Sequence, residues 1–234
     1  MTFEPVLRRR LYQDVAERIE HMIRAGDLPA GESLPSEREL MERFAVGRPA
    51  IREALLSLHQ QGLIEIGNGE RARVSHPDAD RLIGALSGAA QVYLARPVGA
   101  RQFQAARKLF EAAIAREAAR IATPDDIARI GLALEANRQA RGDVAAFVAT
   151  DVAFHLQIVS TTGNPLLTGV HQALTGWLTE QRSVSLTAPG AEASAFGSHQ
   201  RIFAAIAAHD PDAAEAEMRA HLDNVAAFYW DQAK

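Results

Sequence analysis

The sequence lacks several features that define whole classes of protein. Its 234 residues include no cysteine, which excludes disulfide scaffolds, thiolate metal sites and cysteine nucleophiles. No apolar run approaches the about 18 consecutive residues that a membrane span needs. The N-terminus is charged where a secretory signal would be apolar. We therefore expect a soluble, cytoplasmic protein with no membrane contact.

Lysine is scarce, and the chain has no excess of positive charge. Of its 25 basic residues only Lys108 and Lys234 are lysines, and the formal net charge is −4. A global basic signature of nucleic-acid binding is therefore missing, although a small basic face can lie on an acidic protein. The other basic residues are arginines, which recognise phosphate, carboxylate and guanine through paired hydrogen bonds, although genomic composition would produce the same bias.

The first part of the chain carries the signals of three helices. Apolar residues three and four positions apart predict a helix over 11–24. Ser36 and Glu39 form a capping box that opens a short second helix. Pro49 suits the first position of a third helix, which continues to Gly62.

A β-hairpin is predicted after these helices. Residues 63–66 and 71–74 have the alternation of short strands, and the Gly-rich residues 67–70 form the turn between them. Three helices followed by a hairpin are the outline of a winged helix-turn-helix, in which the third helix enters the DNA major groove by its N-terminal end. We therefore assign residues 1–75 to a DNA-binding domain.

Arginines fall where this docking geometry would use them. Arg48 and Arg52 are four residues apart, so they share one face at the start of the third helix. Any single arginine is more simply explained as solvated surface, and the prediction depends on the whole set agreeing with one geometry. The predicted DNA-binding residues are Arg38, Arg48, Arg52, Asn68, Gly69, Arg71 and Arg73.

The stretch LPSERELMERFAVGRPAIREALLSLHQQGLIEIGNGERARVS, residues 34–75, resembles the DNA-binding domain of the GntR family of bacterial transcription regulators. The resemblance implies that Arg38, Arg48 and Arg52 contact DNA, with Asn68 and Gly69 at the wing tip. Before the third helix, many members have a hydroxyl residue where this chain has Gly-Arg-Pro. We therefore expect backbone or solvent to cap that helix.

After a predicted hinge at residues 76–80, the remainder of the chain, residues 81–234, is expected to be all helical. It is rich in alanine and shows no further strand signal. Proline and glycine breaks delimit about seven helices. These are residues 79–95, 100–122, 124–140, 143–161, 165–185, 195–209 and 211–231. The fold class is thus mainly α, a winged helix-turn-helix followed by a helical bundle.

Three histidines and one aspartate form a candidate metal site in this bundle. Asp151 and His155 are four residues apart on one predicted helix, and His199 and His221 lie on two others. Such a set suits zinc, with nickel or manganese as alternatives. A core histidine with an ordinary hydrogen-bond partner would explain the same spacing. His171 and His209 have no ligand-type neighbour at helical spacing and are assigned structural roles.

The helical part resembles the FCD effector domain of the FadR branch of the GntR family. The similarity lies in Arg107–Glu111, Asp151 with His155, Gly163–Pro165, His199 and His221–Leu222. It implies that Asp151, His155, His199 and His221 bind the metal and that Arg107 contacts a small carboxylate effector. Arg107 is explained equally well by a salt bridge to Glu111, one helical turn away.

Three stretches are also similar to NanR-type regulators, which repress sialic acid catabolism: residues 47–75, 83–88 and 162–165. This similarity implies a sugar acid such as N-acetylneuraminate as effector. We predict a homodimeric, ligand-responsive repressor that binds double-stranded operator DNA and is not an enzyme. One alternative is a regulator with the metal itself as effector. A helical metallohydrolase is the other, although the sequence has no H-E-x-x-H motif or other positioned general base.

Overall fold

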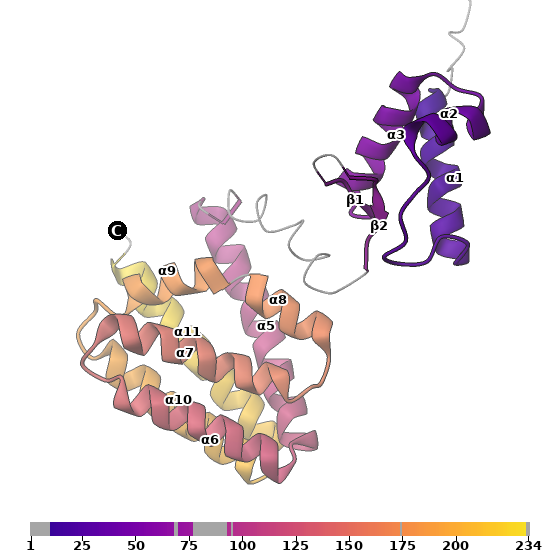
Figure 1. Cartoon of the computed structure of the whole chain (residues 1–234). Helices are drawn as coiled ribbons and strands as arrows, with labels where there is room; N and C mark the ends of the chain where they lie inside the picture. Colours follow the sequence, from indigo (N-terminus) through magenta and orange to yellow (C-terminus); the bar gives the residue numbers. More distant parts are fainter. Residues whose placement is uncertain (1–9, 68–69, 77–92, 95, 174, 233–234) are drawn as a thin grey trace, which may run out of the picture. The chain divides into compact units, whose positions relative to one another are not determined.

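The computed structural model describes residues 10–67, 70–76, 93–94, 96–173 and 175–232. Within them are ten helices and one two-stranded sheet (Figure 1). This confirms the predicted fold class. The chain divides into two compact units, residues 1–85 and 86–234. The predicted hinge at 76–80 and the predicted helix at 79–95 lie almost wholly outside the described residues. Among the described helices, none is long and apolar enough to cross a membrane.

The first unit begins with helices α1 (Leu11–Ala25) and α2 (Glu37–Phe44). The predicted capping box is present at the start of α2. The Glu39 amide donates to Ser36 Oγ over 3.3 Å, and the Ser36 amide donates to Glu39 Oε2 over 2.7 Å. These bonds satisfy amides that have no partner inside the helix, so the start of α2 is fixed by local sequence.

Helix α3 (Arg48–Gln60) follows α2 after a short turn. Gly47 is its N-cap and provides no side-chain cap, as the sequence led us to expect. Arg48 is therefore the first helical residue, and Pro49 is the second rather than the first as predicted. Pro49 is still accommodated, because amides in the first turn have no intrahelical partner to lose.

The predicted hairpin is present as two short antiparallel strands, β1 (Ile64–Glu65) and β2 (Arg73–Val74). Ile64 lies opposite Val74. The strands are shorter than predicted, and Arg71 precedes β2 rather than lying in it. The segment before α2 lies along β2 on its other side, since the Leu34 amide donates to the Ala72 carbonyl over 2.7 Å. This pairing ties the wing to the helices.

One hydrophobic core holds the first unit together. Its members come from all three helices and from both strands, so each helix buries one apolar stripe and exposes its opposite face. The buried side chains include Val15, Ile19, Leu34, Leu40, Ile51, Leu58, Ile64 and Val74. Each large apolar side chain buried in this way stabilises the fold by about 1.5–3 kcal/mol. The arginines are left on the outside.

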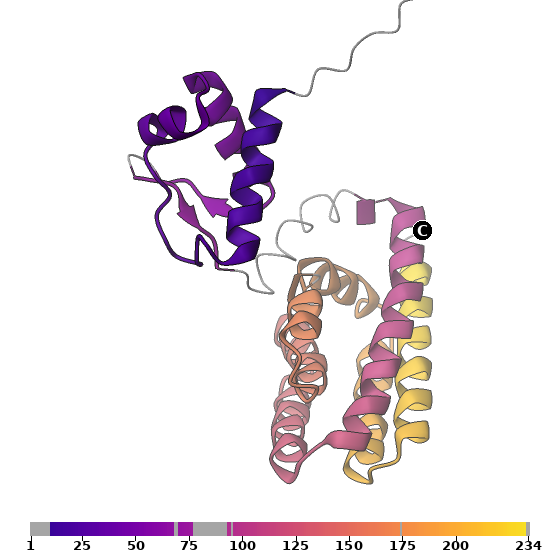
Figure 2. The ribbon, with the colours of Figure 1, turned by 90° about the vertical axis from the view of Figure 1, so that its right-hand side faces the viewer.

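The second unit is a bundle of helices. They are α5 (Pro97–Ile121), α6 (Pro124–Gln139), α7 (Val144–Ser160), α8 (Pro165–Ala173), α9 (Thr175–Ser185), α10 (Ala191–Ala207) and α11 (Pro211–Gln232). Helices α5 and α11 lie side by side (Figure 2), and α10 packs against both α11 and α6. Helix α9 contacts α7 and α11. The predicted helix 165–185 is described as α8 and α9, on either side of residue 174.

Small side chains let the bundle helices approach closely. Ala112, Ala115 and Ala118 of α5 are fully buried, in the same core cluster as residues of α11.

On α7, Asp143 caps the N-terminus by accepting a hydrogen bond from the Ala146 amide over 3.0 Å. The helical period that follows from this start turns residues 151 and 155 toward the core.

Candidate DNA-binding surface and buried metal centre

The start of α3 presents two exposed arginines. Arg48 and Arg52 have 65% and 71% of their side chains exposed. Both lie near one carboxylate at the start of α2, with Glu37 Oε2 at 3.9 Å from Arg48 Nε and Glu37 Oε1 at 3.7 Å from Arg52 Nε. Exposed pairs at these distances contribute little to stability. Both guanidinium groups are therefore available to another anion.

The other predicted DNA-binding residues occupy varied positions. Arg38 is exposed at the start of α2, with Glu42 at 3.7 Å. Arg71 is exposed before β2, whereas Arg73 in β2 donates from Nη1 to the Gly31 carbonyl over 3.1 Å. Asn68 and Gly69 lie outside the described residues. Arg73 is therefore partly committed to an internal contact.

A groove of about 610 Å³ separates the helices from the wing. Arg52 of α3 and Arg71 of the wing both line it. Leu56 and Ile66 also line the groove. Both are apolar, yet their exposed fractions are 52% and 46%. The face that carries the two α3 arginines is thus continuous with a concave surface that ends at the wing.

The four candidate metal ligands come together inside the helical unit. Asp151 and His155 are on α7, His199 is near the middle of α10, and His221 is on α11. All four are buried, and one ligand atom from each lies within 4.8 Å of the others. Three imidazoles and one carboxylate are a donor set that zinc and similar divalent ions accept. The residues present fit such an ion.

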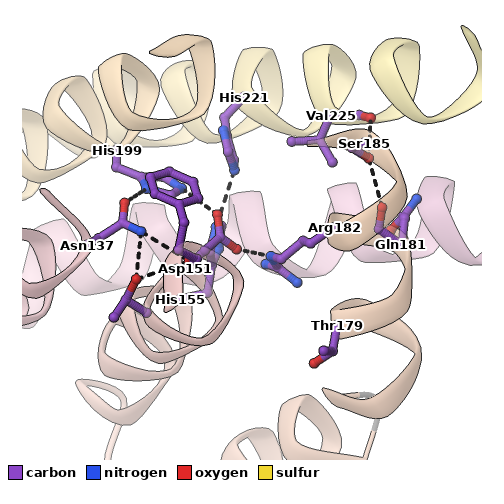
Figure 3. Close-up of polar contacts among 12 residues, drawn as sticks. Asn137, Asp151, His155, Thr179, Gln181, Arg182, Ser185, His199, His221 and Val225 are labelled. Atoms are coloured by element: carbon purple, nitrogen blue, oxygen red, sulfur yellow. Dashed lines mark hydrogen bonds and ion pairs between the residues drawn. The ribbon is translucent and has the colours of Figure 1, made fainter. Parts of the chain in front are cut away.

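The Nε2 atoms of the three histidines face other members of the four-residue group. Nε2 of His155 lies 3.2 Å from Nε2 of His221, and Nε2 of His199 lies 3.2 Å from Asp151 Oδ1 (Figure 3). The Nδ1 atoms of two rings face outward: His155 Nδ1 lies 2.6 Å from Glu111 Oε2, and His199 Nδ1 lies 3.0 Å from Asn137 Oδ1. In metal sites such outer partners fix ring orientation and tautomer.

Burial keeps His199 and His221 in the protonation state that binds metal. It lowers the pKa of His199 and His221 well below the ordinary value, and His155 lowers both further. These rings are therefore neutral at physiological pH, as metal coordination requires. Burial alone would raise the pKa of Glu111, but Arg107 and His155 outweigh it and hold that pKa well below its usual range. Glu111 is ionised.

Arg107 is buried and paired. Its Nε lies 2.5 Å from Glu111 Oε1, so the salt bridge considered from the sequence is present, but inside the protein rather than on its surface. Arg107 Nη1 also donates to Gln181 Oε1 over 3.4 Å. Nη2 has no hydrogen-bond partner among the described residues.

Sequence reasoning did not identify Asn137, Gln181 or Arg182 as part of this site. Arg182 of α9 is buried and forms a close ion pair with the Asp151 carboxylate. Burial and the nearby Arg107 lower the pKa of Arg182, but a guanidinium beside a carboxylate stays protonated. Nothing in the spacing along the chain relates α9 to α7, so the sequence carries no local signal for this pair.

The two histidines assigned structural roles lie outside the four-residue group. His209 Nδ1 is 2.9 Å from the Ala119 carbonyl. His171 is buried beside Arg107 and Glu111, where a cavity of about 240 Å³ opens between α5 and α8. Burial lowers the pKa of His171 to about 4.

Comparison with known proteins identifies two family domains in the chain. The family model described as "Bacterial regulatory proteins, gntR family" matches residues 11–74, and that of the FCD domain matches residues 102–224. The chain is 44% identical over 225 residues to the HTH-type transcriptional repressor NanR of Enterobacter sp. (strain 638), covering 95% of this chain and 86% of that protein. It is 43% identical to the repressor of the same name from Escherichia coli (strain K12), with the same coverage.

Solved structures share the fold. The Streptococcus agalactiae GntR structure is 26% identical with a TM-score of 0.55, covering 92% of this chain and 98% of that one. A gntR-family DNA-binding unit followed by an FCD helical unit with a buried Asp/His cluster defines a ligand-responsive, DNA-binding transcription regulator. The chain belongs to the GntR family of bacterial regulators, in the branch that carries an FCD domain. Its relatives are repressors and not enzymes, which removes the metallohydrolase alternative.

Proposed function

We propose that this protein is a cytoplasmic, homodimeric repressor whose operator binding is controlled by a metal-dependent carboxylate site. Residues 1–75 bind DNA, residues 76–80 act as the hinge, and residues 81–234 bind the effector and form the dimer. The similarity to repressors named NanR supports a sugar acid, such as N-acetylneuraminate, as effector. An effector acts by binding one arrangement of the two DNA-binding units better than another, with a typical coupling of about 1–3 kcal/mol.

The observation that carries this proposal is the buried convergence of Asp151, His155, His199 and His221. These four residues hold the metal, with zinc the first candidate. When bound, the ion supplies positive charge to which a carboxylate can coordinate. Arg107 is the second contact to the effector, through the Nη2 atom that has no partner among the described residues.

In the DNA-binding unit, we assign base contacts in the major groove to the α3 pair Arg48 and Arg52. Their exposure and their place at the start of α3 support this role. The remaining predicted residues, on α2 and the wing, contact the DNA backbone or approach it closely. They are Arg38, Asn68, Gly69, Arg71 and Arg73.

Metal analysis of two histidine variants tests the site. Purified wild type and His171→Ala should contain about one zinc per chain, whereas His199→Ala should lose it. His171 is the matched control because it is also buried in the helical unit but lies outside the ligand group. Equal zinc in all three proteins, with circular dichroism showing intact helices, would rule out the assignment.

A thermal-shift panel then identifies the effector class. Zinc-loaded protein is heated with sugar acids and with dicarboxylates, because a true effector raises the melting temperature according to its concentration relative to its dissociation constant. N-acetylneuraminate should stabilise wild type and not His199→Ala. Stabilisation by dicarboxylates alone would exclude sugar acids.

A metal-responsive regulator is the second candidate. Asp151, His155, His199 and His221 would be enough to fill the coordination sphere of a four-coordinate zinc ion, as in closed, non-catalytic centres. In that case operator affinity would follow free zinc concentration with no organic acid present. A gel-shift titration with buffered zinc, with and without N-acetylneuraminate, separates the two functions.

The dimer is tested by sedimentation. Two chains per operator, on half-sites about one helical turn apart, are expected for a symmetric dimer. A monomer at micromolar concentration with one chain per operator would contradict it.

A further inference from the structure

The buried formal charges of the helical unit balance one another. Among its described residues, four buried side chains carry charge: Arg107, Glu111, Asp151 and Arg182. They form two ion pairs, Arg107 with Glu111 and Arg182 with Asp151. The formal charges of these two ion pairs sum to zero. The two pairs are therefore compensated before any ion enters.

A divalent ion upsets this balance. It adds two positive charges to a site where no further buried carboxylate is found among the described residues. Uncompensated charge away from water is strongly unfavourable. The loaded site therefore favours a bound anion, whereas the two ion pairs of the metal-free site offer no net charge to attract one.

Arg182 is placed to respond to this change. It approaches Asp151 from α9, on the side away from His199 (Figure 3). The two carboxylate oxygens have different neighbours, since Oδ1 faces His199 and Oδ2 faces Arg182 Nε. A divalent ion held by Asp151 would weaken the attraction of that carboxylate for Arg182 and would also repel the guanidinium.

Arg182 also has unused hydrogen-bond donors. Its Nη1 and Nη2 atoms are buried without a hydrogen-bond partner among the described residues, and so is Nε2 of the adjacent Gln181. A small cavity of about 20 Å³ touches Asp151, Arg182 and Ser185 and is otherwise lined by apolar side chains. Buried donors without partners are costly, and a planar carboxylate matches a guanidinium fork.

We propose that Arg182 is a shared counter-ion that couples metal binding to effector binding. Without metal it neutralises Asp151; with metal bound, its terminal nitrogens bind the effector carboxylate. This inference rests on the proposed function, in which Asp151 and the three histidines hold the ion. It adds an effector-binding residue, and it makes Arg182 a competitor of the metal. By linkage, metal and effector then increase each other's affinity by the same factor.

The first test measures the affinity of the protein for zinc with no anionic effector present. Zinc affinity is determined by competition with a chromophoric chelator for wild type, Arg182→Gln and the control Arg201→Gln. Arg201 is on α10 and half-exposed, with Glu217 as its ion-pair partner. Arg182→Gln should bind zinc roughly tenfold more tightly than wild type, because a competing cation is gone, and the control should be unchanged. Equal or weaker zinc binding by folded Arg182→Gln overturns the competition.

The second test measures anions. Acetate and N-acetylneuraminate are titrated by calorimetry into metal-free and zinc-loaded protein. Wild type should bind at least one of them only when loaded, and Arg182→Gln should bind it about 10–100-fold more weakly, the loss typical of a charged hydrogen bond. Arg182→Lys should be intermediate, because it keeps the charge and loses the planar fork. Equal anion affinity in wild type and Arg182→Gln, or equal affinity with and without zinc, refutes the proposal.

A third readout needs no ligand. Metal-free Arg182→Gln should melt at a lower temperature than metal-free wild type, because buried Asp151 loses its only charged partner of opposite sign among the described residues. Zinc should reduce the difference. If wild type binds no zinc, or if His199→Ala binds it equally well, the proposed function fails. If wild type binds zinc, His199→Ala does not, and Arg182→Gln behaves as wild type, only this inference fails.

Discussion

Glu111 Oε2 lies 2.6 Å from Nδ1 of His155, and the opposite oxygen of the same carboxylate lies 2.5 Å from Arg107 Nε. One buried carboxylate on α5 therefore links an arginine to a candidate metal ligand on α7. The contact at Nδ1 leaves His155 Nε2 directed toward His221. Orientation of the ligand is thus set by a residue that is not itself in the ligand group.

Replacing this carboxylate should weaken metal binding. Glu111→Gln is expected to lower zinc affinity by about 10–100-fold, because an outer partner that fixes a histidine ligand contributes this much. Glu117→Gln, on the same helix but exposed, should have no effect. Chelator competition at pH 7 measures both. Unchanged zinc affinity in Glu111→Gln would show that His155 is oriented by packing alone.

Arg52→Ala should remove specific operator binding and leave the fold intact. Loss of one good base contact costs about 1–3 kcal/mol. The control is Arg24→Ala, which removes the same charge from an exposed arginine at the end of α1 that pairs with Glu20. Fluorescence anisotropy at fixed salt, with specific and scrambled duplexes, gives the comparison. The same loss in both variants would indicate a general charge effect.

Glu37 lies near both α3 arginines, at 3.9 Å from Arg48 and 3.7 Å from Arg52. Glu37→Gln should increase affinity for DNA of any sequence by about 0.5–1 kcal/mol, since a negative charge next to the phosphates is removed. Discrimination between operator and scrambled DNA should decrease, because the two guanidinium groups lose a common partner. A larger discrimination in the variant would contradict this role.

Metal-free protein should become less stable as the pH falls from about 6.5 to 4. The folded-state pKa of His171 is lowered to about 4 by burial, and the unfolded value is about 6.5. Between these values the unfolded chain binds a proton that the folded chain does not, so acid favours unfolding. His171 alone lowers the free energy of unfolding by up to about 3 kcal/mol over this pH range.

Urea unfolding with a chelator present, followed by tryptophan fluorescence, tests this pH dependence. Trp177 and Trp230 are the only tryptophans and both belong to the helical unit, so the signal reports that unit alone. His171→Gln should flatten the pH dependence, whereas His21→Gln, exposed on α1, should not. An unchanged slope in His171→Gln would mean that another group takes up the proton.

Much of the DNA-binding unit could be predicted because its signals are local. The capping box joins Ser36 to Glu39, and the apolar stripe of α1 repeats every three or four residues, so each depends on residues within about four positions. Local sequence was less reliable at boundaries. Pro49 proved to be the second helical residue of α3 rather than the first. Arg71 precedes β2, because the ends of this strand depend on pairing with the segment before α2.

The sequence by itself determined most of the described helices, the hairpin and the helical spacing that puts Asp151 and His155 on one face of α7. That spacing follows from a fixed 3.6-residue period, which any stable helix obeys. Only the tertiary structure decided that α10 and α11 bring His199 and His221 to the same place, that α5 supplies Glu111, and that α9 sets Arg182 against Asp151. These contacts join residues far apart in the chain, and they arise when whole apolar faces are buried together, which no local pattern encodes.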